Sequence, residues 1–586
     1  MIAQPPPPSK RWITRSFPNS KEQQGAIETL TNSLGVSPFL SALLVQRGVQ
    51  TYEEARTFFR PEIGHLHNPF EMKDMNKAIT RLQMAMLPER QEKILIYGDY
   101  DVDGTTSVAL VYSFLKNYHT AIDFYIPDRY KEGYGISSQG IQWAADNGFS
   151  LIIALDCGIK SIERVAEAKA LGVDFIICDH HRPGDIVPDA AAVLDPKQED
   201  CLYPYKELSG CGVGFKLMHA FCLHKSIPLD ELYPLLDLVA VSIASDIVPI
   251  TGENRVLAYY GLKQINASPR TGLKALIKIA GFSLGRELDI TNLVFGLGPR
   301  INAAGRIQHA KAAVQLLLAE SEEEADEFAM AINKHNNSRR EFDSSITDQA
   351  LAMIRENESL IHAKSTVLYD ATWHKGVIGI VASRCIEHFH RPTIILTQSN
   401  DKAAGSARSV PGFDVYEAIE ECADLLEQFG GHTFAAGMTM AVSNIEAFQK
   451  KFEEVVARSI KEEHLTPLID IDLPLDFSEI NDKLYRIVRQ MGPFGPHNLQ
   501  PTFMTEDVYL VSEPIIMKEK HLKLNVRQVD KASGRASQTL TAIGFGFAHI
   551  ADQLRSGKPF SICYQVEQNH YNGNTTLQLM LKDVKV

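Results

Sequence analysis

From about Glu92 onward, short apolar runs alternate with glycine turns and amphipathic segments. Apolar runs bounded by turn signals are typical of buried strands, and the segments between them have helical spacing. This alternation predicts an open α/β parallel sheet, which binds ligands at the carboxyl ends of its strands. The predicted strands cover residues 93–97, 121–126, 151–155, 175–178 and 192–194, and the predicted helices cover residues 104–118, 137–147 and 161–171.

Other patterns predict further domains on both sides of this sheet. The chain before it reads as helices, and a long polar helix over residues 321–355 leads to a second α/β unit with strands at 366–369 and 393–396. The last part turns to short strands between polar turns, which predicts a small all-β barrel. The predicted early helices cover residues 20–35, 37–47 and 51–59, and the late strands cover 503–511, 521–526, 539–545, 560–568 and 575–584. The domains expected are 1–85 (helical), 86–325 (parallel sheet), 326–362 (connecting helix), 363–462 (second α/β) and 463–586 (barrel).

Composition narrows the class of protein. At 586 residues the chain is too long for one hydrophobic core. None of its eight cysteines forms a C-x-x-C pair, so neither a zinc site nor a disulfide framework is indicated. No apolar leader or membrane-spanning run is visible, so we expect a cytoplasmic protein without a membrane partner. A net charge of −13 argues against indiscriminate coating of nucleic acid but allows a local basic channel.

Three aspartates alternate after the first predicted strand, at Asp99, Asp101 and Asp103, and Gly104 follows them. Carboxylates this close repel one another, so a fold holds them most readily around a divalent cation. Oxygen ligands favour hard ions such as Mg²⁺ or Mn²⁺. A calcium loop of the EF-hand type fails, because its twelfth position is Leu110 instead of glutamate and a strand precedes it. The alternative is a solvated acidic turn.

Three later apolar runs also end in a carboxylate. One such aspartate is usually a turn or cap residue, but four in series are hard to explain as caps. Parallel strands deliver their ends to one edge, so these carboxylates are expected to meet there. The runs and the aspartates that follow them are residues 151–155 with Asp156, 173–178 with Asp179, and 238–244 with Ser245 and Asp246.

Two histidines, His180 and His181, follow Asp179 directly. A lone histidine is more often a core residue than a ligand, but the aspartates favour a ligand here. Adjacent side chains in extended backbone point in opposite directions, so we assign His180 to the metal and His181 to a substrate phosphate. Such ligands with one bridging carboxylate hold two ions about 3.5–4 Å apart, the spacing used for in-line displacement at phosphorus. The site therefore predicts hydrolysis of a phosphoester or phosphoanhydride.

These motifs resemble, in order and spacing, those of the DHH phosphoesterase family. The second α/β unit resembles the family's DHHA1 domain, and two further blocks at residues 298–306 and 373–384 are similar to its single-strand-specific exonucleases. The resemblance covers nearly the whole chain, from about residue 40 to the end. The motifs are Asp99-x-Asp101-x-Asp103-Gly104, Asp156, Asp179-His180-His181, Ser245-Asp246, and Gly430-Gly431-His432 with Ala436-Gly437.

The resemblance implies a 5′-to-3′ exonuclease that degrades single-stranded DNA to mononucleotides in recombination and repair. It implies two Mn²⁺ or Mg²⁺ ions, with Asp156 as their bridge, and a passage between two α/β lobes that is too narrow for a duplex. Catalysis is expected to depend on Asp156, His181 and Asp103. The metal ligands that it implies are Asp99, Asp101, Asp103, Asp156, His180 and Asp246.

The same resemblance implies that Ser406 and Arg408 hold the 5′ phosphate, with Arg129 from the first lobe. Chemistry agrees, because arginine grips phosphate bidentately and consecutive glycines let backbone N–H groups approach an anion. A glycine pair alone is more often a tight turn. Arg300 and Arg306 are either phosphate contacts or helix-capping surface residues. The remaining expected contacts are Arg384, Gly430, Gly431 and His432.

The clearest basic run lies in the last predicted domain. On a barrel of oligonucleotide-binding type, it predicts a track for a single strand; the alternative is a solvated face. The run consists of Lys518, Lys520, Lys523, Arg527, Lys531 and Arg535.

The expected partners are single-stranded DNA, a single-strand-binding protein and a helicase, and the chain is expected to be a monomer. Two other functions stay open. One is a relative that hydrolyses short oligonucleotides, dinucleotides or 3′-phosphorylated nucleotides, against which the N-terminal region and the barrel count. The other is a non-catalytic DNA-binding replication scaffold, against which the complete set of ligand residues counts.

Overall fold

The computed structural model describes residues 10–129, 131–283, 285–307, 310–529, 534–571 and 574–586. Its contacts divide the chain into two compact units. We call Arg56–Arg339 with Gln490–Leu499 the central unit. We call Met1–Ala55, Arg340–Arg489 and Gln500–Val586 the terminal unit, because it holds both ends of the chain. Among the described residues, no helix is long and apolar enough to cross a bilayer.

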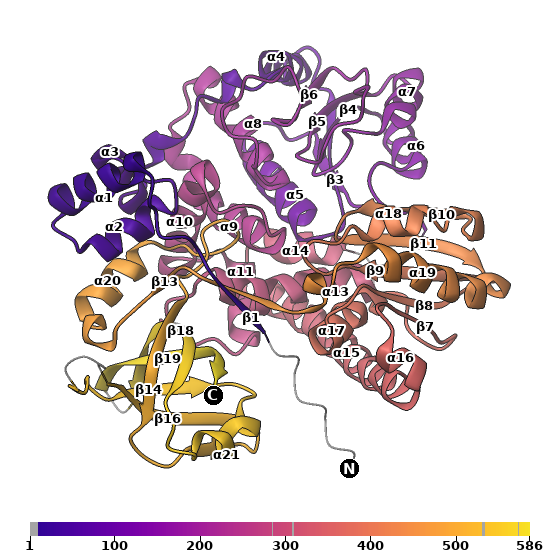
Figure 1. Ribbon diagram of the computed structural model, residues 1–586. Coiled ribbons are helices and arrows are strands. Elements are labelled where there is room, and N and C mark those ends of the chain that lie inside the picture. The colour runs from indigo at the N-terminus through magenta and orange to yellow at the C-terminus, as the bar shows by residue number, and fades with distance from the viewer. Residues whose placement is uncertain (1–9, 130, 284, 308–309, 530–533, 572–573) are drawn as a thin grey trace. The chain divides into compact units, whose positions relative to one another are not determined.

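The central unit contains the predicted parallel sheet, whose described strands run in the order β3-β2-β4-β5-β6. Isoleucine and leucine line both faces of the middle strands, as expected of a sheet covered on both sides. Helices α6 and α7 cover one face, and α5 and α8 cover the other (Figure 1). The strands are β2 (Lys93–Gly98), β3 (Ile122–Tyr125), β4 (Phe149–Leu155), β5 (Asp174–Cys178) and β6 (Ala192–Leu194).

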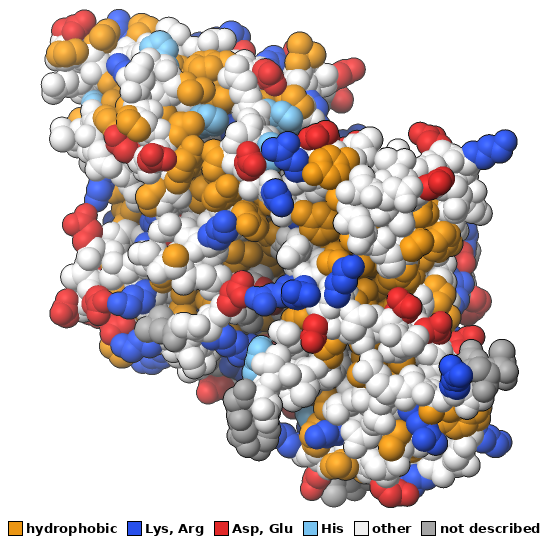
Figure 2. Space-filling view, turned by 90° about the vertical axis from the view of Figure 1, so that its left-hand side faces the viewer, with side chains coloured by type: hydrophobic (Ala, Val, Ile, Leu, Met, Phe, Trp, Pro, Cys, Tyr) orange, Lys and Arg blue, Asp and Glu red, His pale blue; other side chains and the backbone are white. Residues whose placement is uncertain are grey.

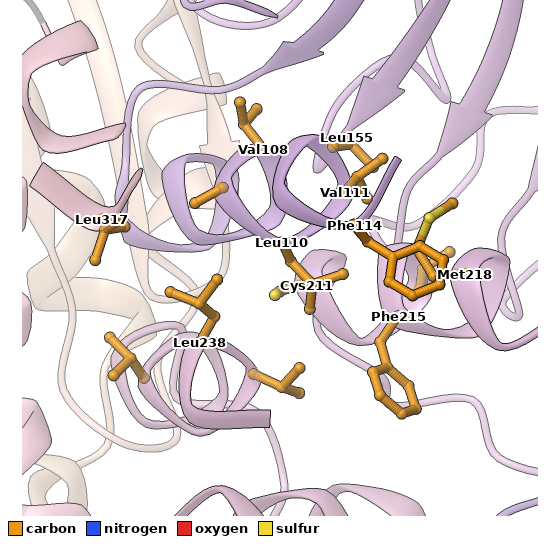
Figure 3. Packing of buried hydrophobic residues seen from close by; sticks show 14 of the residues in the cluster. Val108, Leu110, Val111, Phe114, Leu155, Cys211, Phe215, Met218, Leu238 and Leu317 are labelled. Atoms are coloured by element: carbon orange, nitrogen blue, oxygen red, sulfur yellow. The ribbon is translucent and has the colours of Figure 1, made fainter. Parts of the chain in front are cut away.

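Helix α5 is the centre of the larger core of this unit. Its side chains Val108, Leu110, Val111 and Phe114 pack against residues of the sheet and of neighbouring helices, including Leu155 of β4 (Figure 3). Burial on nearly all sides fixes the start of α5, which begins within the aspartate motif. The helices of the unit are α4 (Met75–Ala85), α5 (Val102–Leu115), α6 (Ser138–Asp146), α7 (Ile162–Ala170), α8 (Gly210–Lys225), α9 (Leu236–Ser245), α10 (Gly252–Ala267), α11 (Thr271–Ile279), α12 (Ile290–Asn292), α13 (Gly298–Ile307) and α14 (Lys311–Leu318). Its short turns are η1 (Ile63–His65), η2 (Pro69–Glu71), η3 (Leu229–Glu231), η4 (Tyr233–Leu235) and η5 (Leu293–Leu297).

The long helix α15 (Glu322–Glu356) runs from the central into the terminal unit, as the polar pattern predicts. Beyond it lies a second sheet, whose described strands have the order β10-β11-β9-β8-β7. Only β7 and β8 pair in parallel, and the other pairs are antiparallel. The strands are β7 (Thr366–Tyr369), β8 (Thr393–Ser399), β9 (Lys402–Arg408), β10 (Gln428–His432) and β11 (Ala435–Ala441). The helices and turns around it are α16 (Glu358–His362), α17 (Ile378–Phe389), α18 (Val415–Glu420), η6 (Ala423–Leu425), η7 (Val442–Asn444) and α19 (Ile445–Ser459).

The predicted C-terminal barrel is present. Strand β14 pairs with both β16 and β18, which closes the order β14-β16-β17-β19-β18 into a barrel of oligonucleotide-binding type. A short helix precedes the fourth barrel strand. The elements are β13 (Leu473–Pro474), β14 (Phe503–Leu510), β15 (Ile515–Met517), β16 (His521–Gln528), β17 (Leu540–Gly544), η10 (Ala548–Ile550), α21 (Ala551–Leu554), β18 (Phe560–Tyr571) and β19 (Asn574–Lys585).

The N-terminal segment begins with a strand, which the helical pattern did not predict. Strand β1 (Arg11–Thr14) pairs in parallel with β12 (Leu468–Ile471), and the indole of Trp12 donates to Asp583 at 2.7 Å. The first helix is N-capped by Ser20 in a capping box. The remaining elements are α1 (Lys21–Leu34), α2 (Pro38–Val45), α3 (Tyr52–Phe59), η8 (Glu462–Leu465), η9 (Phe477–Glu479) and α20 (Asp482–Gln490).

Candidate functional site

Adjacent parallel strands bring three aspartates to one edge of the central sheet. Strand β2 pairs with β4, and β4 with β5, so that Gly98 lies opposite Leu155 and Leu155 lies opposite Cys178. The residues that follow these three partners are Asp99, Asp156 and Asp179. All three are buried, and Asp156 has a left-handed backbone with φ of 59°. The carboxyl edge of the sheet is therefore acidic, as the sequence predicts.

The other two aspartates of the first motif belong to the start of α5. Asp101 is its N-cap, and the carboxylate accepts the N–H of Gly104 at 3.0 Å. A side chain at Gly104 would lie 2.3 Å from the carbonyl oxygen of Asp99, so only glycine fits this turn. Asp103 lies in the first helical turn and is buried.

The carboxylate of Asp103 also holds the start of helix α8. One oxygen accepts the N–H of Gly210 at 2.7 Å, and the other accepts the N–H of Cys211 at 2.8 Å and the hydroxyl of Ser242 at 2.7 Å. Helix N-termini favour negative charge, which stabilises the ionised carboxylate here. Asp103 therefore links the first motif to the helical half of the central unit.

Asp246 reaches the site from a helix, and the expectation that a strand delivers it is wrong. Residues 238–244 lie in α9, and Asp246 is the residue that ends this helix. Ile247, directly after it, is exposed and has a left-handed φ of 60°, which is strained for a β-branched residue. The turn after α9 thus directs the Asp246 carboxylate to the sheet edge.

His180 lies at the centre of these carboxylates. Its Nε2 is 3.2 Å from Asp156, 3.5 Å from Asp246 and 3.6 Å from Asp103. Among the described residues, neither ring nitrogen of His180 has a hydrogen-bond partner. Burial lowers its pKa, which leaves the ring neutral and able to bind a metal.

The possible ligand atoms form three overlapping groups, each within 4.8 Å. Two of the groups share Asp156 and two share His180, so one carboxylate and one imidazole join them. The groups are Asp156 with His180 and His181, Asp103 with His180 and Asp246, and Asp99 with Asp101 and Asp156.

The electrostatics of the site fit divalent cations. Burial, followed by the charge of Asp101, raises the pKa of Asp99 well above its usual range. Burial and then the charge of Asp103 do the same for Asp156, and they raise the pKa of Asp246 to about 8. Cations placed among these carboxylates would reverse each shift. Oxygen ligands with one imidazole suit Mn²⁺ or Mg²⁺, so the residues fit a pair of such ions.

Asp179 has a different task, because its oxygens are already occupied. One accepts the N–H of Ile159 at 2.9 Å, and the other accepts Nδ1–H of His181 at 2.8 Å. Although burial raises it, these bonds bring the pKa of Asp179 down to about 2. Burial lowers the pKa of His181, but the Asp179 carboxylate outweighs it and raises that pKa to about 9. Asp179 thus orients a charged His181 whose Nε2 faces away from it.

Two of the expected 5′-phosphate residues, Ser406 and Arg408, lie together in the terminal unit, whereas Arg129 belongs to the central unit. Arg408 donates to the hydroxyl of Ser406 at 3.0 Å, and both are in β9. A side chain at Gly379 would meet Arg408 at 2.7 Å and Ser406 at 2.9 Å, so both lie beside the first turn of α17. This helix begins after Val377, and no side chain of the described residues caps it. A guanidinium, a hydroxyl and a helix N-terminus together suit a phosphate.

Other predicted phosphate contacts have protein partners in the structure. Arg300 donates to the carbonyl of Gly296 at 2.6 Å and to Asn333 at 3.1 Å. Arg384 is in the middle of α17 and pairs with Glu387 at 3.3 Å. Arg306 is in α13, but its side chain lies outside the described residues.

Arg129 stacks on an aromatic ring, and the glycine pair lies in a strand. The guanidinium of Arg129 stacks over the ring of Tyr100 at 4.8 Å. Gly430 and Gly431 belong to β10 and not to a loop, and a side chain at Gly431 would lie 2.3 Å from the carbonyl of Ala435. Close strand pairing therefore accounts for glycine at 431. The neighbouring His432 accepts the N–H of Phe434 at 3.2 Å.

The basic run of the barrel gathers around one strand. Burial alternates along β16, so His521, Lys523 and Arg527 share its outer face. Lys518 and Lys520 lie in the turn between β15 and β16, and Arg535 precedes β17. Lys531 falls outside the described residues. On the face that Figure 2 shows, Lys and Arg side chains are interspersed with Asp and Glu.

Sequence reasoning missed two aromatic residues. Phe545 follows β17, is 61% exposed, and its ring lies 5.0 Å from that of His521. Tyr134 is 58% exposed, and its hydroxyl lies 3.2 Å from Nε2 of His181. An aromatic residue beside a basic run is a usable signal for Phe545. No local pattern distinguishes Tyr134 from an ordinary surface tyrosine.

Family models match most of the chain. Residues 93–243 match the DHH family N-terminal domain, 359–458 match the DHHA1 domain, and 471–583 match the RecJ OB domain. The fold and the clustered aspartates and histidine thus define a DHH phosphoesterase that carries a DHHA1 domain.

Individual relatives narrow this class. The single-stranded-DNA-specific exonuclease RecJ of Bacillus subtilis is 39% identical over 97% of this chain and 70% of its own length. That of Escherichia coli is 32% identical over 95% of this chain and 97% of its own length. The crystal structure of RecJ in complex with Mn²⁺ from Thermus thermophilus has a TM-score of 0.82 and 25% identity, covering 98% of this chain and 79% of that one. The chain belongs to the RecJ family.

Proposed function

We propose that the protein is an exonuclease that degrades single-stranded DNA from its 5′ end to mononucleotides, in recombination and repair. The observation that carries the proposal is the convergence of five aspartates and His180 at one edge of the sheet, where the ring nitrogens of His180 have no hydrogen-bond partner among the described residues. The aspartates are Asp99, Asp101, Asp103, Asp156 and Asp246. The relatives named single-stranded-DNA-specific exonuclease support it, since they match nearly the whole chain.

The metal centre defines the chemistry. When bound, a pair of Mn²⁺ or Mg²⁺ ions supplies charge neutralisation at the phosphate and a water of lowered pKa. Asp99, Asp101 and Asp156 would hold one ion and Asp103, His180 and Asp246 the other, with Asp156 also near His180. The ends of β2 and β4, the start of α5 and the end of α9 carry these carboxylates, and the end of β5 carries His180.

His181 acts on the substrate. Its Nδ1–H is donated to Asp179, so the Nε2–H of the charged ring, which lies near the Tyr134 hydroxyl, is the group that can donate to a phosphate oxygen. A charge-assisted hydrogen bond of this kind stabilises negative charge that develops on the phosphate during displacement.

The terminal unit is proposed to bind the DNA chain. Arg408, Ser406 and the N-terminus of α17 would hold the terminal phosphate, which sets the direction of degradation. The outer face of β16, with Lys523 and the adjacent Phe545, would follow the strand by charge and by base stacking. Because the substrate is a single strand, we propose that a helicase supplies it and that a single-strand-binding protein covers it, in the cytoplasm.

Digestion of end-labelled DNA tests the proposal. A single strand of about 30 nucleotides, labelled at either end, is incubated with the protein and Mn²⁺, beside a blunt duplex. We expect the 5′ label to appear at once as a mononucleotide, the 3′-labelled strand to shorten progressively, and the duplex to persist. A shortening ladder from the 5′-labelled strand would reverse the direction, and activity on dinucleotides alone would favour the short-substrate relative.

A further inference from the structure

Tyr134 contacts His181, the side chain that we propose to act on the substrate phosphate. Its hydroxyl lies 3.2 Å from Nε2 of His181, while Nδ1 of the same ring lies 2.8 Å from Asp179. Both nitrogens of His181 thus have a polar partner, one on each side of the ring. With the Asp179 contact alone, the imidazole ring of His181 could tilt about that one hydrogen bond. The second contact, with Tyr134, fixes the plane of the ring.

The backbone on either side of Tyr134 is anchored, so the hydroxyl is held in place. We call residues 131–137 the rim loop. The buried hydroxyl of Tyr97 donates to the carbonyl of Gly135 at 3.0 Å and accepts the N–H of Ser137 at 3.1 Å. The carboxylate of Glu132 accepts the hydroxyl of Ser137 and also that of Tyr125, the latter at 3.0 Å. These bonds attach the rim loop to β2 and β3.

The ring of Tyr134 packs against aromatic residues on the side that faces the metal site, and its other side is exposed to solvent. It makes edge-to-face contacts with Tyr100 and with His181, at centroid distances of 6.2 and 6.1 Å. Its 58% exposure means that loss of the hydroxyl leaves no buried group unpaired. Removing this hydroxyl should therefore change the position of His181 without changing the stability of the fold.

We propose that Tyr134 is a positioning residue that holds His181 in the orientation required for contact with the scissile phosphate. This inference rests on the proposed nuclease function and deepens it. The contact of 3.2 Å is at the long end for a hydrogen bond, so Nε2 can take a phosphate oxygen as a second partner while Tyr134 stays in place. Tyr134 would then keep the ring plane fixed through the displacement step.

The test compares Tyr134→Phe, which removes only the hydroxyl, with the wild type and with Tyr118→Phe. Tyr118 is a matched control, since its hydroxyl also contacts a side chain of the central unit, that of Glu231, away from the metal centre. On a 5′-phosphorylated single strand we expect Tyr134→Phe to lower kcat roughly ten-fold. Its KM should stay within about two-fold, because the strand's other contacts are untouched. The control should match the wild type.

A double mutant shows whether Tyr134 acts through His181. If it does, adding Tyr134→Phe to His181→Ala lowers single-turnover rates no further, because the residue to be positioned is gone. A further loss of similar size in the double mutant would overturn the inference, as would an unchanged kcat or a rise in KM alone.

A measurement without catalysis separates this inference from the proposed function. In metal-free protein with ¹⁵N-labelled histidine, the Nε2 resonance of His181, assigned by its loss in His181→Ala, should shift in Tyr134→Phe and not in Tyr118→Phe. Identical spectra would overturn the positioning role even if the wild type degrades DNA. Absence of wild-type hydrolysis with a shifted resonance would refute the nuclease function and leave the contact established.

Discussion

At the level of single residues, Asp103 combines structure and chemistry. Its carboxylate accepts the N–H groups of Gly210 and Cys211 and the hydroxyl of Ser242, and it also faces His180 at 3.6 Å. Asp246 faces the same histidine at 3.5 Å, and no hydrogen bond of its carboxylate is seen in the described part of the chain. Two aspartates at similar distances from one histidine thus differ in what else they hold.

This difference predicts that replacing the two aspartates has unequal effects on stability. In Asp103→Asn the amide NH₂ would face an N–H donor of α8, which costs about 2 kcal/mol and lowers the Tm of metal-free protein by roughly 4–8 °C. Asp246→Asn should leave that Tm within about 2 °C, while both variants lose hydrolysis. Thermal unfolding in EDTA, followed by circular dichroism, measures this. Equal Tm values for the two variants would show that Asp103 does not support α8.

Sequence reasoning succeeded for residues whose role follows from a local pattern. Asp99, Asp156 and Asp179 follow apolar runs, and parallel strands must deliver such residues to one edge. Asp246 follows a similar run, but its run is α9, which is buried on all sides and so shows no helical periodicity. Tyr134 could not be predicted at all, because its contact with His181 joins residues 47 positions apart.

At the level of elements, the start of α17 and strand β9 form one potential phosphate site. The sequence predicted Ser406 and Arg408 from the family resemblance, but the proximity of α17 depends on how β9 packs in the sheet. Arg384 belongs to the same helix, but it lies beyond its first turn and pairs with Glu387. Strand β9 therefore offers a test residue, Arg408, and helix α17 offers a control of the same type, Arg384.

We expect Arg408→Ala to abolish the preference for 5′-phosphorylated over 5′-hydroxyl ends, because a bidentate phosphate contact is lost. Arg384→Ala should retain the preference. The ratio of kcat/KM on the two kinds of end measures it, and a fall of about ten-fold or more in that ratio is expected for Arg408→Ala. If the kcat/KM ratio is unchanged in Arg408→Ala, the terminal phosphate binds at a different site.

The outer face of β16 is the second element with a testable role. Lys523→Ala removes a charge, and Phe545→Ala removes a ring on which a base can stack, worth about 1–3 kcal/mol. We expect both to weaken binding of a 30-nucleotide strand in EDTA, with a shallower salt dependence only for Lys523→Ala. Lys461→Ala, an exposed lysine outside the barrel, is the control. Fluorescence anisotropy gives the Kd values; wild-type affinity in both barrel variants would contradict the track.

At the level of the whole molecule, metal binding should support both the hydrolytic activity and the thermal stability of the protein. The clustered carboxylates repel one another without cations, and ligands that bind only the folded state stabilise it by mass action. We expect Mn²⁺ at about 100 times its Kd to stabilise the central unit by about 2.7 kcal/mol. Asp156→Ala should lose this stabilisation and at least about 1,000-fold in hydrolysis.

The same variant should keep most of its affinity for single-stranded DNA, since the proposed contacts at β9, α17 and β16 lie in the terminal unit. Calorimetric scans with and without Mn²⁺, together with anisotropy in EDTA, measure both effects. Mn²⁺-dependent heat resistance that persists in Asp156→Ala would mean that the ions bind elsewhere.

The pairing of β1 with β12 has a consequence for how the chain is made. Arg11 lies opposite Leu468, which is 457 positions later in the sequence. A ribosome adds about 5–20 residues per second, so the first strand waits roughly 20–90 seconds for its partner to be synthesised. Throughout that interval the N-terminal segment of the nascent chain has an unpaired strand edge. We therefore expect chaperones to bind this segment, and we expect it to be the part of the nascent chain most prone to misassembly.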